Sequence, residues 1–327
     1  MTSIAVAVVN YNTRDHLRTC LSSVFAERPT EVVVVDNASL DGSVEMVQAE
    51  FPSATLRVNK TNIGYGAAAN QAIATVKSAY VLLLNADTRL QPGALEALSA
   101  YLDQHPRAAI VGPRLAESDG TLQASCYPFP TPLDTFLENC KAAIIVGRTV
   151  RRYCPTVGRF YLRTWPHNFA RTVSWVKGAV LTIRREAFDA IGGFDPSYFM
   201  YFEDADLCYR LTASGWEIHF TPVTTAVHSG GASTRQRHAV MSLQLLTSTV
   251  RFYQRHCSTF QLAIMIVVLR WLMLSRWAGA ATRLVFTRDP GKRSLLAQEI
   301  STSQQFSRWA SPLRFWRATF YSRHRTL

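Results

Sequence analysis

The sequence predicts an α/β fold in which helices cover both faces of a mainly parallel, twisted sheet. Short runs rich in Val and Ile alternate with longer segments that carry apolar side chains at helical spacing. This alternation is typical of β-α-β units, whose strands lie parallel. The chain has 327 residues, of which 48% are hydrophobic, so it can bury one large core or a core with a smaller appendage.

The N-terminal part of the chain carries strand signals separated by helix signals. Residues 4–9 and 31–35 are apolar runs that end in polar residues, and apolar side chains recur at helical spacing over 15–25 between them. This pattern predicts a β-α-β start. The signals that follow predict strands at 56–58 and 80–84 and helices at 67–76 and 93–102.

The pattern loosens over residues 125–173, where several prolines and little periodicity predict irregular structure or a mobile flap. Regular patterns return beyond this segment. Residues 176–183 predict a strand, and residues 185–191 and 204–214 predict helices. The glycines that would close these helices are Gly192, Gly193 and Gly215.

The C-terminal part differs from the rest of the chain in charge. Residues 251–327 contain 13 basic and two acidic residues, whereas residues 1–250 contain 22 basic and 21 acidic residues. The contrast predicts a body over 1–250 and a basic helical extension over 251–327. Aromatic residues stand among the arginines of this extension, which favours an anionic membrane surface over nucleic acid as its partner. The tryptophans are Trp271, Trp277, Trp309 and Trp316.

Three further features bear on location. Residues 262–269 form an apolar run that Arg270 and Arg276 interrupt, too short and too charged for a membrane span, so we expect an amphipathic helix in the membrane plane. The six cysteines form no C-x-x-C pair and no zinc-like spacing, which favours reduced thiols. The N-terminal run has no features of a signal peptide, so we expect a cytoplasmic protein, which the basic extension would place on the inner face of the plasma membrane.

Two acidic signatures point to a reaction. Asp87 follows a buried strand over 80–84, and ligands bind at the carboxyl ends of parallel strands. Glu203, Asp204 and Asp206 stand together beside an aromatic segment, an expensive place for carboxylates unless a metal or a proton transfer uses them. Together the signatures predict metal-assisted transfer chemistry.

Each acidic residue also has a structural interpretation. Asp204 could cap the helix that follows it, and Asp206 could pair with Arg210 one turn later. Asp87 could cap a helix ahead of Pro92. As a functional group, Asp204 could be a general base, because a base must be a carboxylate within reach of the nucleophile's proton.

Other polar groups lie at strand ends. Asn10, Asn12 and Asp36 close the first two strands, where Asp36 could accept hydrogen bonds from a nucleobase or a ribose, or could form a turn. The segment Asn62-Ile-Gly64-Tyr-Gly66 resembles a dinucleotide fingerprint but does not follow the first strand, so we interpret it as a tight loop that opens a helix.

Metal binding has few candidate ligands. Asp87 offers one carboxylate, and His228 is the candidate for a second ligand, although a single His is more often structural. Mg²⁺ or Mn²⁺ needs few protein oxygens when substrate phosphates complete the shell. The two residues therefore predict a divalent ion shared with a phosphate-bearing substrate.

The ordered series of motifs is more specific than any one of them. It comprises Asn10-Tyr-Asn12, Val35-Asp36-Asn37-Ala38-Ser39, Asn62-Ile-Gly64-Tyr65-Gly66 with Asn70, Asn85-Ala86-Asp87, Trp175-Val-Lys-Gly178-Ala179, Gly192-Gly193-Phe194-Asp195, Tyr198-Phe-Met-Tyr201 with Glu203-Asp204-Ala-Asp206-Leu207, and His228. Over residues 3–235 this series resembles family 2 glycosyltransferases of the GT-A fold. The rhamnosyltransferase-like branch is the most similar.

The resemblance implies roles for individual residues. Asp204 would be the catalytic base, Asp36 would contact the base of the nucleotide, and Asp87 would end a D-x-D-like motif in which Asn85 replaces the first Asp. Asp87 and His228 would bind the metal. The implied donor-binding residues are Asn10, Asn12, Asp36, Asn62, Gly64, Asn70, Asn85 and Asp87, and the implied acceptor-binding residues are Trp175, Gly178 and Glu203.

The resemblance also implies an activity. The enzyme would invert the anomeric centre as it moves a sugar, L-rhamnose from dTDP-rhamnose as the best candidate, to a glycan or a polyprenyl-diphosphate-linked acceptor in cell-envelope polysaccharide synthesis. Residues 1–124 would bind the nucleotide sugar, and residues 125–250 would bind the acceptor and hold the base. The extension would keep the enzyme at the membrane, where such an acceptor lies.

Three alternatives remain at this level. A sugar-nucleotide pyrophosphorylase has a similar sheet, but its Gly- and Arg-rich first loop is replaced here by residues 10–15. An inactive membrane- or protein-binding module is disfavoured by Asp87, Asp204 and His228. An oxidoreductase would require tight nicotinamide binding, which a fluorescence titration would detect.

Overall fold

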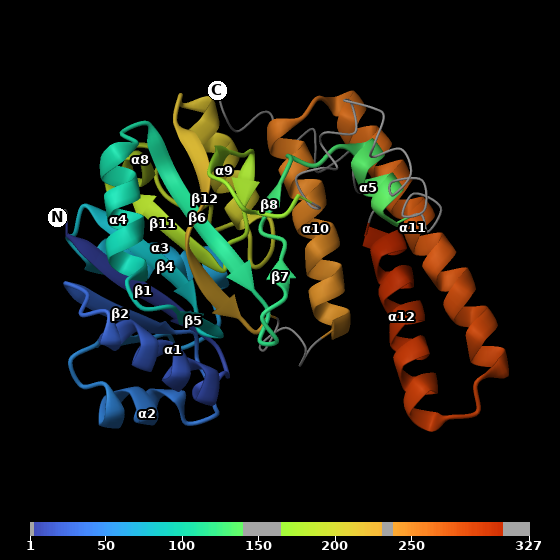
Figure 1. Ribbon diagram of the computed structural model, residues 1–327. Coiled ribbons are helices and arrows are strands. Elements are labelled where there is room, and N and C mark those ends of the chain that lie inside the picture. Colours follow the sequence, from blue (N-terminus) through green and yellow to red (C-terminus); the bar gives the residue numbers. More distant parts are fainter. Residues whose placement is uncertain (1–2, 140–164, 231–237, 310–327) are drawn as a thin grey trace. The chain divides into compact units, whose positions relative to one another are not determined.

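The computed structural model describes residues 3–139, 165–230 and 238–309 of the chain (Figure 1). The chain divides into two compact units. The first unit comprises Met1–Phe129 and Pro155–Gln236, and the second comprises Pro130–Cys154 and Arg237–Leu327. The domain boundary predicted at residue 250 falls inside helix α10 (His238–His256) and stays a prediction.

A mixed sheet organises the first unit. Its main path has the order β3-β2-β1-β4-β11-β6-β12-β5. The first four strands of this path are parallel, as the sequence predicts, and β11 runs antiparallel to both of its neighbours. The bounds are β1 Ile4–Asn10, β2 Glu31–Asp36, β3 Thr55–Val58, β4 Tyr80–Asn85, β5 Thr88–Leu90, β6 Ala108–Ala116, β11 Val180–Arg184 and β12 Glu217–His228, with β7 Leu122–Gln123 and β9 Arg171–Thr172 paired at the side.

Helices cover both faces of this sheet (Figure 1). In β1, Ala5 and Ala7 join the core on one face, whereas Val6 and Val8 join the core on the other, because successive side chains of a strand point to opposite faces. One face packs against α3, α8 and α9, and the other against α1, α2 and α4. The helix bounds are α1 Arg14–Ala26, α2 Ser43–Glu50, α3 Tyr65–Thr75, α4 Ala94–Gln104, α8 Arg185–Ala190 and α9 Glu203–Ala213.

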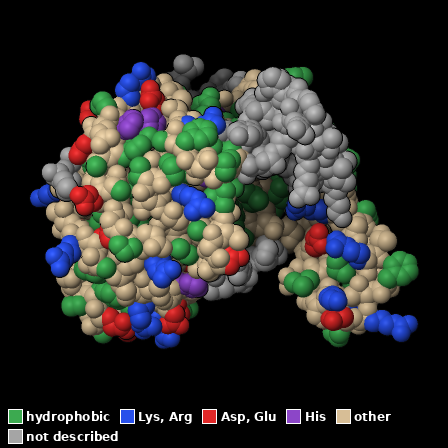
Figure 2. All heavy atoms as spheres, viewed as in Figure 1, with side chains coloured by type: hydrophobic (Ala, Val, Ile, Leu, Met, Phe, Trp, Pro, Cys, Tyr) green, Lys and Arg blue, Asp and Glu red, His purple; other side chains and the backbone are tan. Residues whose placement is uncertain are grey.

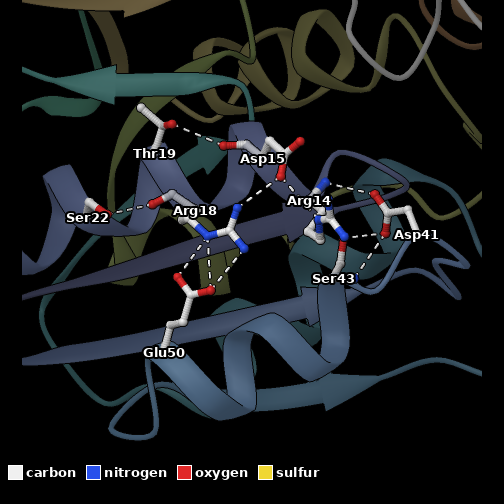
Figure 3. Close-up of polar contacts among 8 residues, drawn as sticks. All are labelled: Arg14, Asp15, Arg18, Thr19, Ser22, Asp41, Ser43 and Glu50. Carbon is white, nitrogen blue, oxygen red and sulfur yellow. Dashed lines mark hydrogen bonds and ion pairs between the residues drawn. The ribbon is translucent and has the colours of Figure 1, made fainter.

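Ion pairs join α1 to α2 at the surface (Figure 3). Arg18 donates hydrogen bonds to both carboxylate oxygens of Glu50 and to Asp15. The backbone N–H of Arg14 donates to Asp41 at 2.8 Å, which ties the start of α1 to the loop after β2. Exposed pairs of this kind contribute little stability, so their main effect is to hold these loops in place. Elsewhere on the visible face of this unit, acidic and basic side chains are interspersed (Figure 2).

The strand predicted over 176–183 is confirmed at 176 and over 180–183, but it is interrupted between them. The chain leaves β10 (Trp175–Val176) and enters β11 at Val180. Between them the backbone N–H of Lys177 donates to Ser125, and that of Gly178 donates to the carboxylate of Asp204. The backbone turns out of the sheet because these groups bind elsewhere.

The loosely patterned segment 125–173 contains some regular structure. Its described parts hold β8 (Cys126–Tyr127), which pairs with β10, and helix α5 (Pro132–Asn139), which Pro132 opens as helix-starting prolines often do. Residues 140–164 of this segment lie outside the described residues. Strand β12, which no sequence pattern predicted, is irregular around Pro222 and ends at His228.

Four helices are described in the second unit, α5, α10, α11 (Thr259–Phe286) and α12 (Pro290–Trp309). Ser258 and Gln261 form a capping box that starts α11. Among the described residues, α11 is the one helix long and apolar enough to cross a membrane by length and composition, and 33% of its most apolar window is buried inside the protein. It is longer than the apolar run 262–269. The predicted tail residues beyond 309, Trp316 among them, lie outside the described residues.

Candidate active site

The residues predicted to form the site lie in the first unit, most of them at one edge of the sheet. Asn10 ends β1, Asp36 ends β2, Asn85 ends β4 and His228 ends β12. These four strands run in the same direction, because β11 is antiparallel to β4 and to β6, and β12 is parallel to β6. Carboxyl ends of parallel strands are the usual ligand-binding edge of such a sheet.

Hydrogen bonds join the loops after β1 and β2. Asp36 is 1% exposed, and its two oxygens accept from the side-chain amide of Asn10 at 2.7 Å and from the backbone N–H of Ser39 at 2.8 Å. The Ser39 hydroxyl accepts from the backbone N–H of Asn12, whose side-chain oxygen accepts from the N–H of Leu40. The structure thus brings Asn10, Asn12 and Asp36 together in one network.

The loop before α3 requires glycine. Gly64 has φ +89°, and a Cβ atom there would lie 2.6 Å from the carbonyl oxygen of Phe199. The same carbonyl accepts the N–H of Tyr65 at 2.9 Å, and the Asn62 side chain accepts the N–H of Gly64. Close packing therefore holds this loop against the segment that leads into α9.

Asn70 fixes a second loop. Its side-chain amide donates to the carbonyl of Phe194 at 2.8 Å and accepts the N–H of the same residue at 2.9 Å. A Cβ atom on Gly193 would lie 2.7 Å from this amide oxygen, so glycine is needed at that position. Asn62 and Asn70 hold backbone in this structure, and their roles in donor binding stay predictions.

Asp87 and His228 meet although they are far apart in the sequence. The antiparallel pairing of β5 with β12 places His228 opposite Thr88, and the N–H of Ser229 donates to the carbonyl of Asp87 at 3.0 Å. As a result, Asp87 Oδ1 lies 3.3 Å from His228 Nε2, and the amide nitrogen of Asn85 lies 3.4 Å from the same atom. Both predicted metal ligands are therefore at one place.

These residues fit a metal ion that shares its shell with a substrate. Asp87 and His228 offer one oxygen and one nitrogen side by side. No group of three His, Cys, Asp or Glu in the described part of the chain could hold an ion on its own. Ions of the Mg²⁺ type commonly take one or two carboxylates and draw the rest of their shell from phosphates and water.

Asp204 and Glu203 lie together at the start of α9. Asp204 accepts from the N–H groups of Gly178 and Ala205, both at 2.8 Å. Burial raises the pKa of Asp204, and the Gly178 N–H opposes that effect. Burial and the neighbouring Asp204 raise the pKa of Glu203 to about 8, and its Oε2 atom accepts no hydrogen bond from any described residue. Carboxyl groups with raised proton affinity suit proton transfer near neutral pH.

Of the predicted acceptor residues, Gly178 contacts this acidic pair and Glu203 belongs to it. A Cβ atom on Gly178 would lie 3.2 Å from the carboxylate of Asp204, so glycine allows the carboxylate to sit against the backbone. Trp175 stacks on Tyr127 with ring centroids 4.7 Å apart, and its ring N–H donates to Pro128. The role of Trp175 in acceptor binding stays a prediction.

Sequence reasoning missed three polar residues. Gln123 accepts from the ammonium of Lys177 at 3.3 Å and lies 2.7 Å from His228 Nδ1, and the Tyr65 hydroxyl donates to the carbonyl of Gly178. Burial lowers the pKa of Lys177, whereas Glu117, Asp87 and Asp204 raise it. Lys177 therefore lies near both Asp87 and Asp204. It belongs to the motif Trp175-Val-Lys-Gly178-Ala179, whereas Gln123 lies in a two-residue strand that no sequence pattern predicts.

Comparisons with known proteins identify the family of this chain. Residues 2–264 match the model of a family described as glycosyltransferase like family 2. The N-acetylglucosaminyl-diphospho-decaprenol L-rhamnosyltransferase of Mycobacterium tuberculosis is 32% identical over 244 residues, which cover 71% of this chain and 77% of that protein. The rhamnosyltransferase WbbL of Escherichia coli is 36% identical over 83 residues, which cover 25% of this chain and 31% of that protein.

Solved structures agree with the fold. The mannosyltransferase PcManGT of Pyrobaculum calidifontis, solved with GDP-Man and Mn²⁺, superposes with a TM-score of 0.53 at 17% identity and covers 94% of this chain and 83% of its own. GalNAc-T7, solved with UDP, GalNAc and Mn²⁺, gives a TM-score of 0.54 at 16% identity and covers 78% of this chain and 48% of its own. The fold is GT-A, and the chain belongs to glycosyltransferase like family 2 as a hexosyltransferase.

Proposed function

We propose that this protein transfers L-rhamnose, from dTDP-rhamnose as the best candidate donor, to a hydroxyl of a glycan carried on a polyprenyl diphosphate. The observation that carries the proposal is the meeting of Asp87 with His228 at 3.3 Å. Lys177 donates to Gln123, the hydrogen-bond partner of His228, and interacts electrostatically with Asp87 and Asp204. The relative from Mycobacterium tuberculosis, named for rhamnosyl transfer to a decaprenol-linked sugar, supports L-rhamnose as the sugar and a lipid-linked glycan as the acceptor. The setting would be cell-envelope synthesis.

The nucleotide would bind at the loops after β1 and β2. Asp36 accepts two hydrogen bonds within the protein, and each carboxylate oxygen can accept another, so a base or ribose donor can still bind it. Asn12 holds the loop that carries Leu40, which is almost fully exposed. These contacts would shape the nucleotide site before the donor arrives.

Asp87 and His228 would hold a divalent ion, Mg²⁺ or Mn²⁺, together with the diphosphate of the donor. When bound, such an ion stabilises the negative charge that develops on the departing nucleoside diphosphate. Two structures of the same fold were solved with Mn²⁺, which supports a metal here. Lys177 would add a positive charge near Asp87 and Asp204.

Asp204 would accept the proton of the acceptor hydroxyl. As that oxygen forms a bond to the anomeric carbon, the bond from this carbon to the donor phosphate breaks, and a single displacement inverts the centre. The N–H of Gly178 holds the carboxylate in place at 2.8 Å, which fixes the direction in which it can receive the proton. Glu203 would contact the acceptor beside it.

Transfer by the purified protein tests this proposal. The full chain would be incubated with a panel of nucleotide sugars and a short polyprenyl diphosphate that carries N-acetylglucosamine, with and without a chelator. We expect a rhamnosylated lipid whose anomeric configuration is opposite to that of the donor, and no product with excess chelator. Retention of configuration, transfer of another sugar in preference to rhamnose, or full activity in chelator would each contradict one part of the proposal.

We also propose that the second unit keeps the enzyme at the membrane surface. The extension holds 13 basic residues against two acidic ones, and α11 exposes Phe260, Val267 and Leu274. Each basic residue near an anionic surface contributes about 1 kcal/mol, which salt weakens. The full chain should sediment with anionic vesicles more than with neutral ones. Alkaline extraction should release a surface-bound helix and would leave a membrane-spanning helix in the pellet.

A further inference from the structure

The hairpin between β6 and β7 places Glu117 and Gln123 side by side. The N–H of Glu117 donates to Thr121 and the N–H of Gly120 donates to Glu117, which closes a tight turn with Gly120 at φ +83°. In the ladder that follows, Gln123 pairs with Leu115. Gln123 is 8% exposed, so its amide must find its partners within the protein.

The partners of this amide determine its orientation. Gln123 Nε2 lies 2.6 Å from Glu117 Oε1 and 3.3 Å from the carbonyl oxygen of His228, and both of these atoms are acceptors. Gln123 Oε1 lies 3.3 Å from the ammonium of Lys177, which only donates. A flipped amide would set an oxygen against two oxygens and an NH₂ against an ammonium. The orientation shown is therefore the favourable one.

This orientation places a proton on one nitrogen of His228. Gln123 Oε1 lies 2.7 Å from Nδ1 of the imidazole, so Nδ1 must carry the proton that it donates. A neutral imidazole has a single N–H, so its Nε2 atom then carries a lone pair. That lone pair faces Asp87 Oδ1 at 3.3 Å, where a neutral imidazole has no proton to offer. The Asn85 amide, whose nitrogen lies 3.4 Å from Nε2, can donate to this lone pair in the metal-free protein. A cation bound between Asp87 and His228 would take the place of that donor.

We propose that Gln123, oriented by Glu117, is a positioning residue that holds His228 in the tautomer needed to bind a divalent ion through Nε2. This inference rests on the metal site proposed at Asp87 and His228. Partners of this type fix the tautomer and ring orientation of a ligating histidine, and their loss commonly weakens metal affinity about 10–100-fold. Gln123 itself does not touch the ion or the substrate.

Metal affinity and the tautomer provide two independent tests. Mn²⁺ would be titrated into the full chain in the presence of dTDP and followed by electron paramagnetic resonance. Gln123→Met keeps the length of the side chain but removes its hydrogen bonds, and we expect Mn²⁺ affinity to fall about 10–100-fold. In the metal-free protein labelled with ¹⁵N-histidine, the His228 signals should show a proton on Nδ1, and Gln123→Met should remove this preference.

Matched variants separate positioning from general damage. Leu122→Met alters the exposed neighbour on the same short strand and should leave Mn²⁺ affinity and tautomer unchanged. The exchange Glu117→Gln with Gln123→Glu keeps a donor facing an acceptor and an oxygen facing Nδ1. It should bind Mn²⁺ more tightly than either single variant, and it keeps the test available if Gln123→Met fails to fold.

Three results would overturn the inference. A wild-type His228 protonated on Nε2 would contradict the deduced tautomer, and wild-type Mn²⁺ affinity in Gln123→Met would contradict the positioning role. Wild-type Mn²⁺ affinity in His228→Ala would instead show that the proposed metal ligand is wrong, and the inference would fail with it.

Discussion

The two ends of the candidate site differ in how far their polar groups are satisfied. At the nucleotide end, both oxygens of Asp36 and the hydroxyl of Ser39 accept hydrogen bonds from neighbouring loops. At the transfer end, Glu203 Oε2 accepts no hydrogen bond from any described residue, and His228 Nε2 faces the Asp87 carboxylate. At the nucleotide end every oxygen named here has a partner within the protein and the loops form a closed network, whereas at the transfer end one carboxylate oxygen has no partner among the described residues.

This difference distinguishes residues that hold the loops of the site in place from residues that take part in the reaction. A buried polar atom without a partner costs about 1–3 kcal/mol, so it persists in a native protein where a substrate, ion or proton uses it. A closed network fixes the position of its loops, and it has fewer polar atoms without a partner that a substrate, an ion or a proton could bind. Changes at the transfer end should therefore affect transfer, whereas changes at the nucleotide end should affect stability and donor affinity.

The largest expected effect is at Asp204. Asp204→Asn keeps the size of the side chain and removes the charge that receives a proton, so transfer should fall about 10²–10⁴-fold. Donor binding should be unchanged, because the base faces the acceptor. Single-turnover transfer and donor titration would measure the two quantities separately. Near wild-type transfer would place the base elsewhere and would break the distinction between the two ends.

Glu203 should make stability depend on pH. Its pKa in the folded protein is raised to about 8, so the folded state holds the proton more tightly than the unfolded chain does. This contribution to stability is complete below the ordinary pKa of Glu and is lost as pH rises through about 8. Glu203→Gln cannot ionise, so its advantage over the wild type should reach the order of a few kcal/mol near pH 9.

Thermal unfolding over a pH series would measure this effect. The wild-type midpoint should fall from about pH 5 to about pH 9 more steeply than that of Glu203→Gln. Parallel curves for the two proteins would show that Glu203 ionises with the ordinary pKa of a Glu side chain. The transfer end would then not contain a carboxyl group of raised pKa.

Lys177 should have a smaller effect on transfer. Its ammonium lies near Asp87 and Asp204 and donates to Gln123. Lys177→Met removes that charge, and kcat/KM should fall about 10–100-fold, the usual range for a hydrogen bond made by a charged group. Lys177→Arg keeps the charge and should retain more activity. Equal losses in both variants would show that the shape of the side chain matters and its charge does not.

Much of this site could be predicted from the sequence because its residues lie at strand ends. Asp36 ends β2, Asp87 follows the end of β4, and Asp204 lies at the start of α9, so all three stand beside strong strand or helix signals. Gln123 could not be predicted, because its position depends on a two-residue strand and its partner His228 is 105 residues away. Local patterns carry no information about such a contact.

Tertiary hydrogen bonds shape two features that local sequence patterns do not predict. The predicted strand 176–183 is interrupted where the Asp204 carboxylate binds the N–H of Gly178. The side chains of Asn62 and Asn70 bind the backbone of Gly64 and Phe194, and their roles in donor binding stay predictions. In each case a tertiary hydrogen bond determines what the local sequence leaves open.

The smallest expected effect is at Gly64, in the loop before α3 at the nucleotide end of the site. Gly64 and Gly93 both have positive φ, +89° and +79°, but a Cβ atom would lie 2.6 Å from the Phe199 carbonyl oxygen at Gly64 and would meet nothing within 4 Å at Gly93. Replacing glycine by alanine at such an angle costs about 1 kcal/mol. Gly64→Ala should cost about 1–2 kcal/mol more than Gly93→Ala, because the carbonyl must also move.

Chemical denaturation would compare the two variants, and donor titration would show where the loss appears. The loop of Gly64 positions the start of α3 and the chain before α9. Gly64→Ala should therefore weaken donor binding, while the rate of sugar transfer from the bound donor should change little. Gly93→Ala should leave donor binding unchanged. If Gly64→Ala instead lowered the rate as much as Asp204→Asn does, the nucleotide end would share in the chemistry, and a closed network could not be taken as the mark of a purely structural region.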